Sequence, residues 1–357
     1  MRNMLPKFLQ WRYDLYLSEK FDLYGTLGFY IKQQVRRFKL IGNSKVAYIY
    51  ANKRNVGDYI SSCGIQQVVG LEGPELFSSP EWSKSLNNYL KKIKNRNPNC
   101  LLIIGGGGLL QPVFTPFWDT ILNSGIRFVA LGIGVNHMQG REVIDPIFID
   151  KIIDKAEFFG VRDTSTLKMI SPLYRKKVQL EICPSVNFVK PLFWQPSPEK
   201  NNTLLHIKHP SDLRLSGIDE ELLSNNLKKI AKQNGWLYEE NTNMSSDHIA
   251  ILTKVSLARF VVSSRLHGCI MSFACGIPFL PILCDKKIAA FNDTHTGVKG
   301  ISPVDVTDTN LLIKRITYIL GSFDNQEDKL NNKVQNNIEL GLKINDLTGD
   351  KPVKTEN

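Results

Sequence analysis

The chain has 357 residues, which is enough for two α/β domains at roughly 150 residues each. No apolar run approaches the roughly 20 residues of a membrane-spanning helix, and the N-terminus lacks the pattern of a signal peptide, so we expect a cytoplasmic protein. The formal net charge of +11 indicates a polyanionic partner: an anionic lipid surface, a phosphorylated substrate or nucleic acid. Nucleic acid is not expected, because no basic motif interleaved with aromatic residues is visible.

Six cysteines occur in apolar surroundings without the C-x-x-C spacing of zinc or redox sites. We expect reduced thiols in the core rather than a disulfide framework, and no structural metal. The cysteines are Cys63, Cys100, Cys183, Cys269, Cys275 and Cys284.

Residues 1–40 form the first expected unit, a basic helical segment that mixes aromatic and aliphatic residues. Such an amphipathic segment can lie on an acidic membrane face, with its rings at the headgroup boundary and Arg36, Arg37 and Lys39 on phosphates. The alternative is a helical arm packed on its own domain or on a partner chain. The first interpretation predicts peripheral contact with the inner face of the plasma membrane.

A strand is predicted from Val46 to Tyr50, followed by a turn and a helix that begins near Asp58. Two roles are open for Asp58 at the carboxyl end of this strand. It can cap the helix, or it can accept a hydrogen bond from a hydroxyl group of a substrate.

A second buried strand runs into four consecutive glycines, Gly105 to Gly108. Four glycines lose much conformational entropy on folding, so the backbone there should come close to a ligand or to a crossing helix. The pattern is neither a Walker loop nor a complete G-x-G-x-x-G fingerprint. Gly106 and Gly107 are therefore candidate ligand contacts without being a nucleotide signature.

Three further strands are expected in this half of the chain, at Ile126 to Leu131, Phe158 to Val161 and Val178 to Ile182. Arg162 follows the middle one and places a guanidinium at the carboxyl end of a strand. An anion contact is the functional interpretation. The alternative is a structural ion pair with Asp163 or a neighbour.

A polar, proline-containing stretch at residues 191–202 is interpreted as a linker between domains of residues 41–190 and 203–322. The second domain repeats the alternation of strands and helices, so each half should contain a parallel sheet. The predicted fold class is therefore α/β, with two Rossmann-like domains facing across a cleft. A polar helix and a disordered tail are expected over residues 323–357.

The stretch from Arg259 to Leu283 contains a strand, a charged turn, a helix and a second strand. Ser263 and Ser264 are the small polar pair expected to cap the helix, and Arg265 and His267 lie on its start. First-turn amide groups and the helix dipole create an anion site there, which a guanidinium and an imidazole strengthen. The alternative is an arginine paired with a structural carboxylate and a satisfied buried histidine.

Several motifs follow one another along the chain: N-V-G-D, IIGGGG, LGIG, FGVRDTST, CPS and SSRLHG before Gly-Ile-Pro. In their order and spacing, from about residue 45 to 285, the chain resembles the polysaccharide pyruvyl transferases. The resemblance implies a glycosyltransferase B-like fold and transfer of the enolpyruvyl unit of phosphoenolpyruvate onto two hydroxyls of one sugar, which gives a cyclic ketal. It also implies that Arg265, His267 and Arg162 contact phosphoenolpyruvate, with His267 as the acid/base. The chain departs from the family pattern at residues 135–137 and at both termini.

The expected function is pyruvyl transfer to a sugar of a cell-surface polysaccharide or of its precursor, which a polyprenyl phosphate would carry. Phosphoenolpyruvate is then a co-substrate, and neither a cofactor nor a metal is expected. The candidate catalytic residue is His267, since an imidazole can give and take protons near neutral pH. The candidate substrate-binding residues are Arg265, Leu266, Arg162, Asp58, Gly106, Gly107, Ser264 and Gly268.

Two other functions fit the same pattern. A sugar-nucleotide-dependent glycosyltransferase with this two-domain plan would hold a diphosphate with Arg265 and the helix start, although no glutamate-rich nucleotide-ribose motif is found in the second half. A noncatalytic binder of glycans or polyanions would use the basic cleft without proton transfer.

Overall fold

The structure is a computed structural model in which part of the expected basic segment (residues 1–39), of the linker (195–199) and of the tail (350–357) lies outside the described residues. The described residues are 40, 43–51, 55–80, 83–135, 142–194, 200–242, 247–323 and 327–349.

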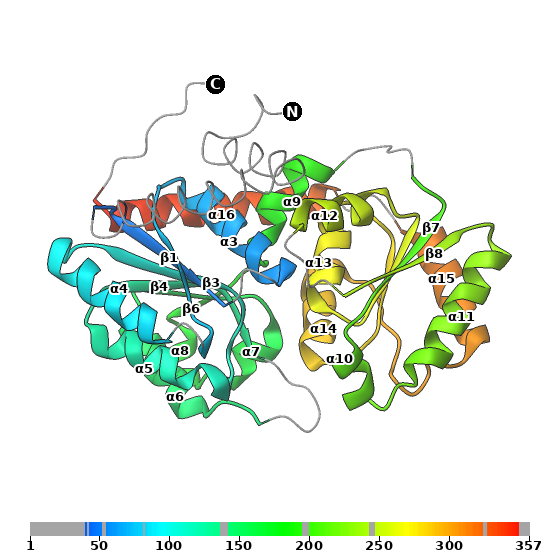
Figure 1. Cartoon of the computed structure of the whole chain (residues 1–357), viewed down its shortest axis with the longest axis horizontal. Coiled ribbons are helices and arrows are strands. Elements are labelled where there is room, and N and C mark those ends of the chain that lie inside the picture. Colours follow the sequence, from blue (N-terminus) through cyan, green and yellow to red (C-terminus); the bar gives the residue numbers. More distant parts are fainter. Residues whose placement is uncertain are drawn as a thin grey trace, which may run out of the picture.

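Two parallel sheets divide the chain into an N-terminal and a C-terminal α/β domain, side by side in Figure 1. Every neighbouring strand pair in both sheets is parallel, which confirms the predicted fold class. The principal strands are buried throughout, as expected for parallel sheets that helices cover on both faces.

The N-terminal sheet has the strand order β2-β1-β3-β4-β5-β6. Its strands are β1 (Val46–Tyr50), β2 (Glu75–Phe77), β3 (Leu101–Leu110), β4 (Phe128–Val135), β5 (Phe158–Val161) and β6 (Val178–Leu180). The helices of this domain are α3 (Val56–Val69), α4 (Ser83–Arg96), η3 (Pro112–Phe114), α5 (Thr115–Ser124), α6 (Pro146–Lys155), α7 (Thr164–Met169), α8 (Pro172–Arg175) and α9 (Ser185–Phe193). Helix α9 ends at Phe193, so residues 191–193 of the stretch interpreted as a linker are helical.

The C-terminal sheet has the strand order β10-β9-β7-β8. Its strands are β7 (Thr203–Ile207), β8 (Leu237–Asn241), β9 (Phe260–Ser263) and β10 (Phe279–Pro281). The helices that follow the linker are α10 (Pro210–Leu215), α11 (Glu220–Gln233), α12 (His248–Leu257), α13 (Leu266–Ala274), α14 (Lys286–Phe291), η4 (Asn292–Thr296), α15 (Thr309–Ser322) and α16 (Glu327–Leu347).

Each sheet reverses its strand order at one point. In the N-terminal sheet β1 lies between β2 and β3, and in the C-terminal sheet β7 lies between β8 and β9. Ligands of such sheets bind outside the carboxyl ends of the strands at this reversal. The starts of α3, after β1, and of α13, after β9, therefore occupy the positions where this fold class places ligands.

The predicted role of Asp58 as a helix cap is wrong. Asn55 caps α3 instead, because its Oδ1 accepts the N–H of Gly57 at 3.0 Å, and the helix begins at Val56. Asp58 consequently lies in the first helical turn.

The predicted capping of α13 by Ser263 and Ser264 is also wrong. The capping position is Arg265, which makes no side-chain cap bond. Ser263 instead closes the turn, since its Oγ accepts the N–H of Arg265 at 3.1 Å and donates to the carbonyl of Arg265 at 2.9 Å. The helix start is therefore held by a local turn before it.

Both domains share one apolar core. It forms where α3 and α9 of the first domain pack against α12 and α13 of the second, in the middle of Figure 1. Val56 and Ile60 of α3 and Ile270 of α13 are fully buried in it. All six cysteines are free and buried, four of them in this core or on the helices that form it. The core fixes the separation of the two helix starts.

The last helix, α16, returns from the second domain to the first (Figure 1). Leu340 and Ile344 pack in a core cluster of the N-terminal domain, and Asn337 Nδ2 donates to Asn187 Oδ1 at 2.6 Å. The sequence predicted a polar helix here, but not that its apolar stripe covers the first domain. Among the described helices, none combines the length and the apolar character that crossing a bilayer requires.

Replacement of Gly341 by Ala should destabilise the protein, because a Cβ atom there would lie 2.1 Å from the backbone oxygen of Val68 in α3. Overpacking of this kind typically costs about 1–3 kcal/mol. Gly321→Ala is the matched control, since no atom lies within 4 Å of the corresponding Cβ position. Urea denaturation should give a lower midpoint for Gly341→Ala alone. Equal midpoints for the two variants would contradict the close approach of α16 to α3.

Candidate active site

Two helix starts meet at the domain boundary. The ring of His267, in the first turn of α13, packs on Gly57, in the first turn of α3. A Cβ atom on Gly57 would lie 1.9 Å from the ring Nδ1, so only glycine leaves room for the imidazole. The structure thus brings the turns after β1 and after β9 into one site.

His267 is buried, with 8% of its surface exposed, and it contacts groups of the N-terminal domain. Its Nε2 lies 3.5 Å from Ser61 Oγ and 3.9 Å from Cys183 Sγ. Cys183 Sγ in turn lies 3.2 Å from Ser61 Oγ and accepts a hydrogen bond from Ser185 Oγ at 3.2 Å. Because both contacts to the imidazole are long, packing orients the ring more than hydrogen bonding does.

Arg162 is the most deeply buried cation of the site, with 1% of its surface exposed. Its guanidinium lies against Gly134, where a Cβ atom would be 2.6 Å from Nε. Among the described residues, neither Nε nor Nη1 has a hydrogen-bond partner. A buried cation with unsatisfied donors is unfavourable, and an oxyanion is the ligand that satisfies a guanidinium best.

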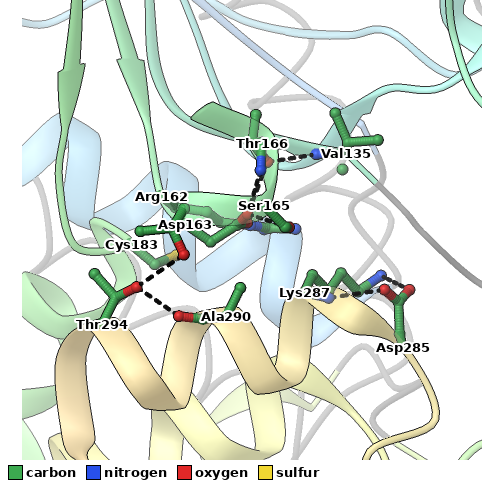
Figure 2. A network of polar contacts seen from close by, with 12 residues as sticks. Val135, Arg162, Asp163, Ser165, Thr166, Cys183, Asp285, Lys287, Ala290 and Thr294 are labelled. Carbon is green, nitrogen blue, oxygen red and sulfur yellow. Dashed lines mark hydrogen bonds and ion pairs between the residues drawn. The ribbon is translucent and has the colours of Figure 1, made fainter. Parts of the chain in front are cut away.

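The alternative role of Arg162 is an ion pair with Asp163. The two groups do approach each other, but Nε and Oδ2 are 3.8 Å apart, which is too long for a hydrogen bond. Asp163 instead caps α7: its Oδ1 accepts the N–H and the hydroxyl of Thr166 at 2.8 and 2.9 Å, and the hydroxyl of Ser165 at 2.6 Å (Figure 2). Thr166 Oγ1 also accepts the N–H of Val135 at 3.0 Å. These bonds fix the turn that carries Arg162.

The C-terminal domain packs on the same turn. His295 Nε2 lies 3.0 Å from the carbonyl oxygen of Arg162, and Thr294 Oγ1 lies 3.3 Å from Thr164 Oγ1. Thr294 and His295 belong to η4, a π-helical turn after α14, and Figure 2 shows α14 beside the turn. Arg162 therefore lies between the two domains.

Arg265 extends from the start of α13 and is largely buried, with 16% of its side chain exposed. Its Nη1 lies 3.8 Å from Asp212 Oδ2 of α10, and His209 Nδ1 lies 3.7 Å from Asp212 Oδ1. Arg265 thus has the structural carboxylate of the alternative interpretation, Asp212, but the two groups are farther apart than a hydrogen bond. The guanidinium keeps enough exposure to bind a ligand.

Lys287 is a third cation of the site, and the sequence interpretation missed it. Its Nζ lies 3.1 Å from Asp285 Oδ2 (Figure 2). Asp285 caps α14, because its Oδ1 accepts the backbone N–H of Lys287. Asp285 and Lys287 follow the carboxyl end of β10. The signal that identified Arg162, a charge just after a strand, would have found Lys287 too.

Two titratable groups share the field of these three cations. Burial raises the pKa of Asp58 to about 7, although the three cations act to lower it. Burial and the same cations hold the pKa of His267 well below its ordinary value. At neutral pH a large fraction of Asp58 is protonated and His267 is neutral. The cations that act on both groups are Arg162, Arg265 and Lys287.

Two glycines within β3 make room for α3. Cβ atoms on Gly106 and Gly107 would lie 2.8 Å from Ser61 Cβ and 2.4 Å from Asp58 Oδ1, and both glycines have positive φ angles, of 79° and 105°. Approach of a helix, one of the two expected reasons, accounts for both. Contact of these glycines with a substrate stays a prediction.

The remaining predicted contacts differ in what they offer a ligand. Leu266 places its side chain in the shared apolar core, which leaves only its backbone amide. Gly268 lies against Ser263, whose Oγ would be 2.1 Å from an added Cβ atom. Ser264 Oγ is buried and has no hydrogen-bond partner in the described part of the chain, so a ligand can use this hydroxyl.

Within the ranges that the structure describes, no group of three His, Cys, Asp or Glu side chains could hold a metal ion.

Comparison with known proteins places the sequence in a family. Residues 52–286, more than half of the chain, match the family model described as polysaccharide pyruvyl transferase. No curated protein matches the chain.

Solved structures share the two-domain fold at low sequence identity. S. aureus MnaA with UDP has a TM-score of 0.56 and 8% identity, covering 88% of this chain and 100% of its own. Methanocaldococcus jannaschii UDP-GlcNAc 2-epimerase with UDP-GlcNAc and UDP has a TM-score of 0.52 and 9% identity, covering 78% and 93%. A glycosyltransferase from Rickettsia africae has a TM-score of 0.50 and 10% identity, covering 86% and 99%. The fold is therefore glycosyltransferase B-like, as expected.

Inorganic phosphate should stabilise the protein by binding the cations of this site. At 100 times its dissociation constant a ligand adds about 2.7 kcal/mol to the free energy of unfolding, which raises the melting temperature. Arg162→Gln should lose this response, and Arg127→Gln should keep it, because Arg127 pairs with Glu157 on the surface. The readout is the phosphate-dependent shift, with potassium chloride of equal ionic strength as the reference. A similar shift in both variants would place phosphate elsewhere.

Proposed function

The chain belongs to the polysaccharide pyruvyl transferase family, and from this premise we propose that it transfers pyruvate, as a cyclic ketal, from phosphoenolpyruvate to a sugar. The acceptor would be a residue of a cell-surface polysaccharide or of its lipid-linked precursor. The observation that carries the proposal is the convergence of three cations and a neutral imidazole at the boundary between two parallel sheets.

Phosphoenolpyruvate carries a carboxylate and a phosphate on a three-carbon unit, so its site needs several cationic donors close together. Arg162 offers donors without a partner among the described residues, and Arg265 can chelate a second oxyanion in bidentate fashion. Lys287 adds a point charge from α14, next to Asp285. Amides at the start of α13, supported by the helix dipole, complete an anion site.

His267 is suited to take a proton from an attacking hydroxyl group. Its surroundings keep the imidazole neutral at the pH of the cell, which is the form that acts as a base. Ser61 and Cys183 lie beside Nε2, and Gly57 leaves the space that the ring occupies. The hydroxyl of Ser264 can position the donor or the sugar.

The acceptor side is proposed for the N-terminal domain, where Asp58 and the glycines of β3 border the site. A net charge of +11 and the basic segment of residues 1–40 suit an acceptor on a polyprenyl phosphate at the inner face of the plasma membrane. The same proposal includes peripheral contact of the protein with the inner face of the plasma membrane.

A sugar-nucleotide glycosyltransferase is the second candidate, because structures of similar fold contain UDP or UDP-GlcNAc. The same cations could hold a diphosphate. The unsatisfied guanidinium favours a compact anion with several charged groups, but it does not distinguish the donors by itself. A noncatalytic polyanion binder is the third candidate.

Incubation with phosphoenolpyruvate and a panel of free and lipid-linked sugar acceptors tests the function directly. We expect one phosphate released for each ketal, and an acceptor mass increased by pyruvate less one water. UDP-sugars are added in a parallel panel, with UDP release as the readout. Turnover of UDP-sugars alone would replace the proposal with the glycosyltransferase. Binding of glycans without turnover of either donor would favour the noncatalytic binder.

Two substitutions should reduce turnover while leaving donor binding nearly intact. His267→Ala removes the base, a loss of about 100-fold to 10,000-fold in kcat. Gly57→Ala displaces the ring, because its Cβ atom would overlap Nδ1, and a displacement of about 1 Å can cost about 100-fold. Gly321→Ala is the control for added volume in a helix. Full turnover in Gly57→Ala, with donor affinity unchanged, would remove His267 from the mechanism.

A further inference from the structure

The proposed reaction moves more than one proton. A ketal forms when the methylene carbon of the donor gains a proton and two sugar hydroxyls each lose one. A single histidine would have to start as an imidazolium to protonate the methylene carbon. The three cations around His267 and its burial oppose that charged form. A second acid is therefore needed in the site.

Asp58 occupies the right place for this second group. Gly57, Asp58 and Ser61 lie on one face of α3, since residues three and four apart in a helix are neighbours. Gly57 packs on the ring of His267, and Ser61 Oγ lies 3.5 Å from its Nε2. The carboxyl group of Asp58 lies against Gly107 of β3, next to the helix start that packs on His267.

Asp58 is buried close to charged groups of both domains. Its surface is 6% exposed, and Oδ1 lies against Gly107 at the carboxyl end of β3. Three charged groups act on it: Arg162 from the turn after β5, Arg265 from the start of α13 and Lys287 from α14. Burial outweighs them and raises the pKa of Asp58 to about 7.

We propose that Asp58 is the acid that protonates the methylene carbon of phosphoenolpyruvate, while His267 is the base for the first attacking hydroxyl. This inference rests on the proposed function and divides between two residues the proton transfers that one histidine would otherwise perform. The two groups then start the reaction in the protonation states that their surroundings favour.

The first half of the reaction forms one C–O bond and one C–H bond. His267 takes the proton of the first hydroxyl, and the sugar oxygen bonds to the carbon that bears the phosphate. The π electron pair of the donor takes the proton of Asp58, which turns the methylene into a methyl group. Asp58 is left as a carboxylate and His267 as an imidazolium, both in the field of a bound anion.

The second half restores both groups. The C–O bond to phosphate breaks, the electron pair leaves with phosphate, and His267 gives that phosphate its proton. The second hydroxyl attacks the same carbon, and its proton goes to the carboxylate of Asp58. The products are the ketal and hydrogen phosphate, so charge and protons balance without another reactant.

Asp58→Asn tests this assignment, because the amide keeps the shape and cannot give a proton. We expect kcat to fall by about 100-fold to 10,000-fold with donor affinity changed less than about threefold. In the wild type, kcat/KM should fall above pH about 7, as Asp58 loses its proton. A phosphate monoester titrates near pH 6, so the donor does not produce this alkaline limb. The residual activity of Asp58→Asn should not show this fall of kcat/KM at alkaline pH.

Glu181→Gln is the matched control. Glu181 is another buried carboxyl of the same domain whose pKa is raised, to about 8, but it lies beside Gly160 and α16. This variant should keep the alkaline limb and the turnover of the wild type. If the fall of kcat/KM above pH 7 disappeared in Glu181→Gln but not in Asp58→Asn, the titrating group would be Glu181, and the proposal would be overturned.

Stability measured against pH separates a chemical effect from misfolding. The pKa of Asp58 is raised on folding, so its contribution to stability is lost as pH rises from about 4 to about 7. Asparagine does not ionise, and the melting temperature of Asp58→Asn relative to wild type should be higher at pH 8 than at pH 5. The proposal is overturned if the folded variant turns over within about threefold of wild type, or if wild-type kcat/KM stays level from pH 7 to 9. Absence of any ketal from the wild type would instead refute the proposed function.

Discussion

Three cations, Arg162 fully buried and Arg265 and Lys287 largely buried, are the constraint on which the rest of this structure depends. Like charges repel more strongly where water is excluded, so their positions must be imposed by the fold. Each has a carboxylate within reach: Asp163 Oδ2 is 3.8 Å from Arg162, Asp212 Oδ2 is 3.8 Å from Arg265, and Asp285 Oδ2 is 3.1 Å from Lys287. For Arg162, Nε and Nη1 have no hydrogen-bond partner in the part of the chain that the structure describes. These unsatisfied donors of Arg162 favour an oxyanion as the ligand of the site.

The fold imposes these positions with an apolar core on one side and glycines at the contacts. The core of α3, α9, α12 and α13 fixes the domains, and three functional side chains of the boundary lie against glycines. His267 packs on Gly57, and in the same way Asp58 packs on Gly107 and Arg162 on Gly134. A β-carbon at any of the three positions would displace a group that the proposed reaction needs. The need for glycine at these positions is thus decided by the neighbouring side chains.

The strand-to-helix alternation and the charges after strands were sufficient to predict two parallel sheets and to select Arg162 and Arg265. Other features depend on contacts that local sequence does not encode. Ser61 and His267 are 206 residues apart, and their contact exists only because the domains pack together. The choice of Asn55 over Asp58 as the cap of α3 was also undetermined, since both residue types cap helices and both stand in the same turn. The crossing of α16 could not be predicted either, because its apolar stripe does not reveal which domain it covers.

One environment can separate the pKa values of two groups because burial and positive charge act differently on an acid and on an imidazole. For Asp58 they oppose each other, and the pKa settles near neutrality. For His267 they act together, and the pKa falls far below it. Entry of an anionic donor compensates the cations and so raises both pKa values. Asp58 then holds its proton more firmly, and His267 gains the capacity to accept one. Binding of the donor would in this way prepare the acid and the base that its own reaction requires.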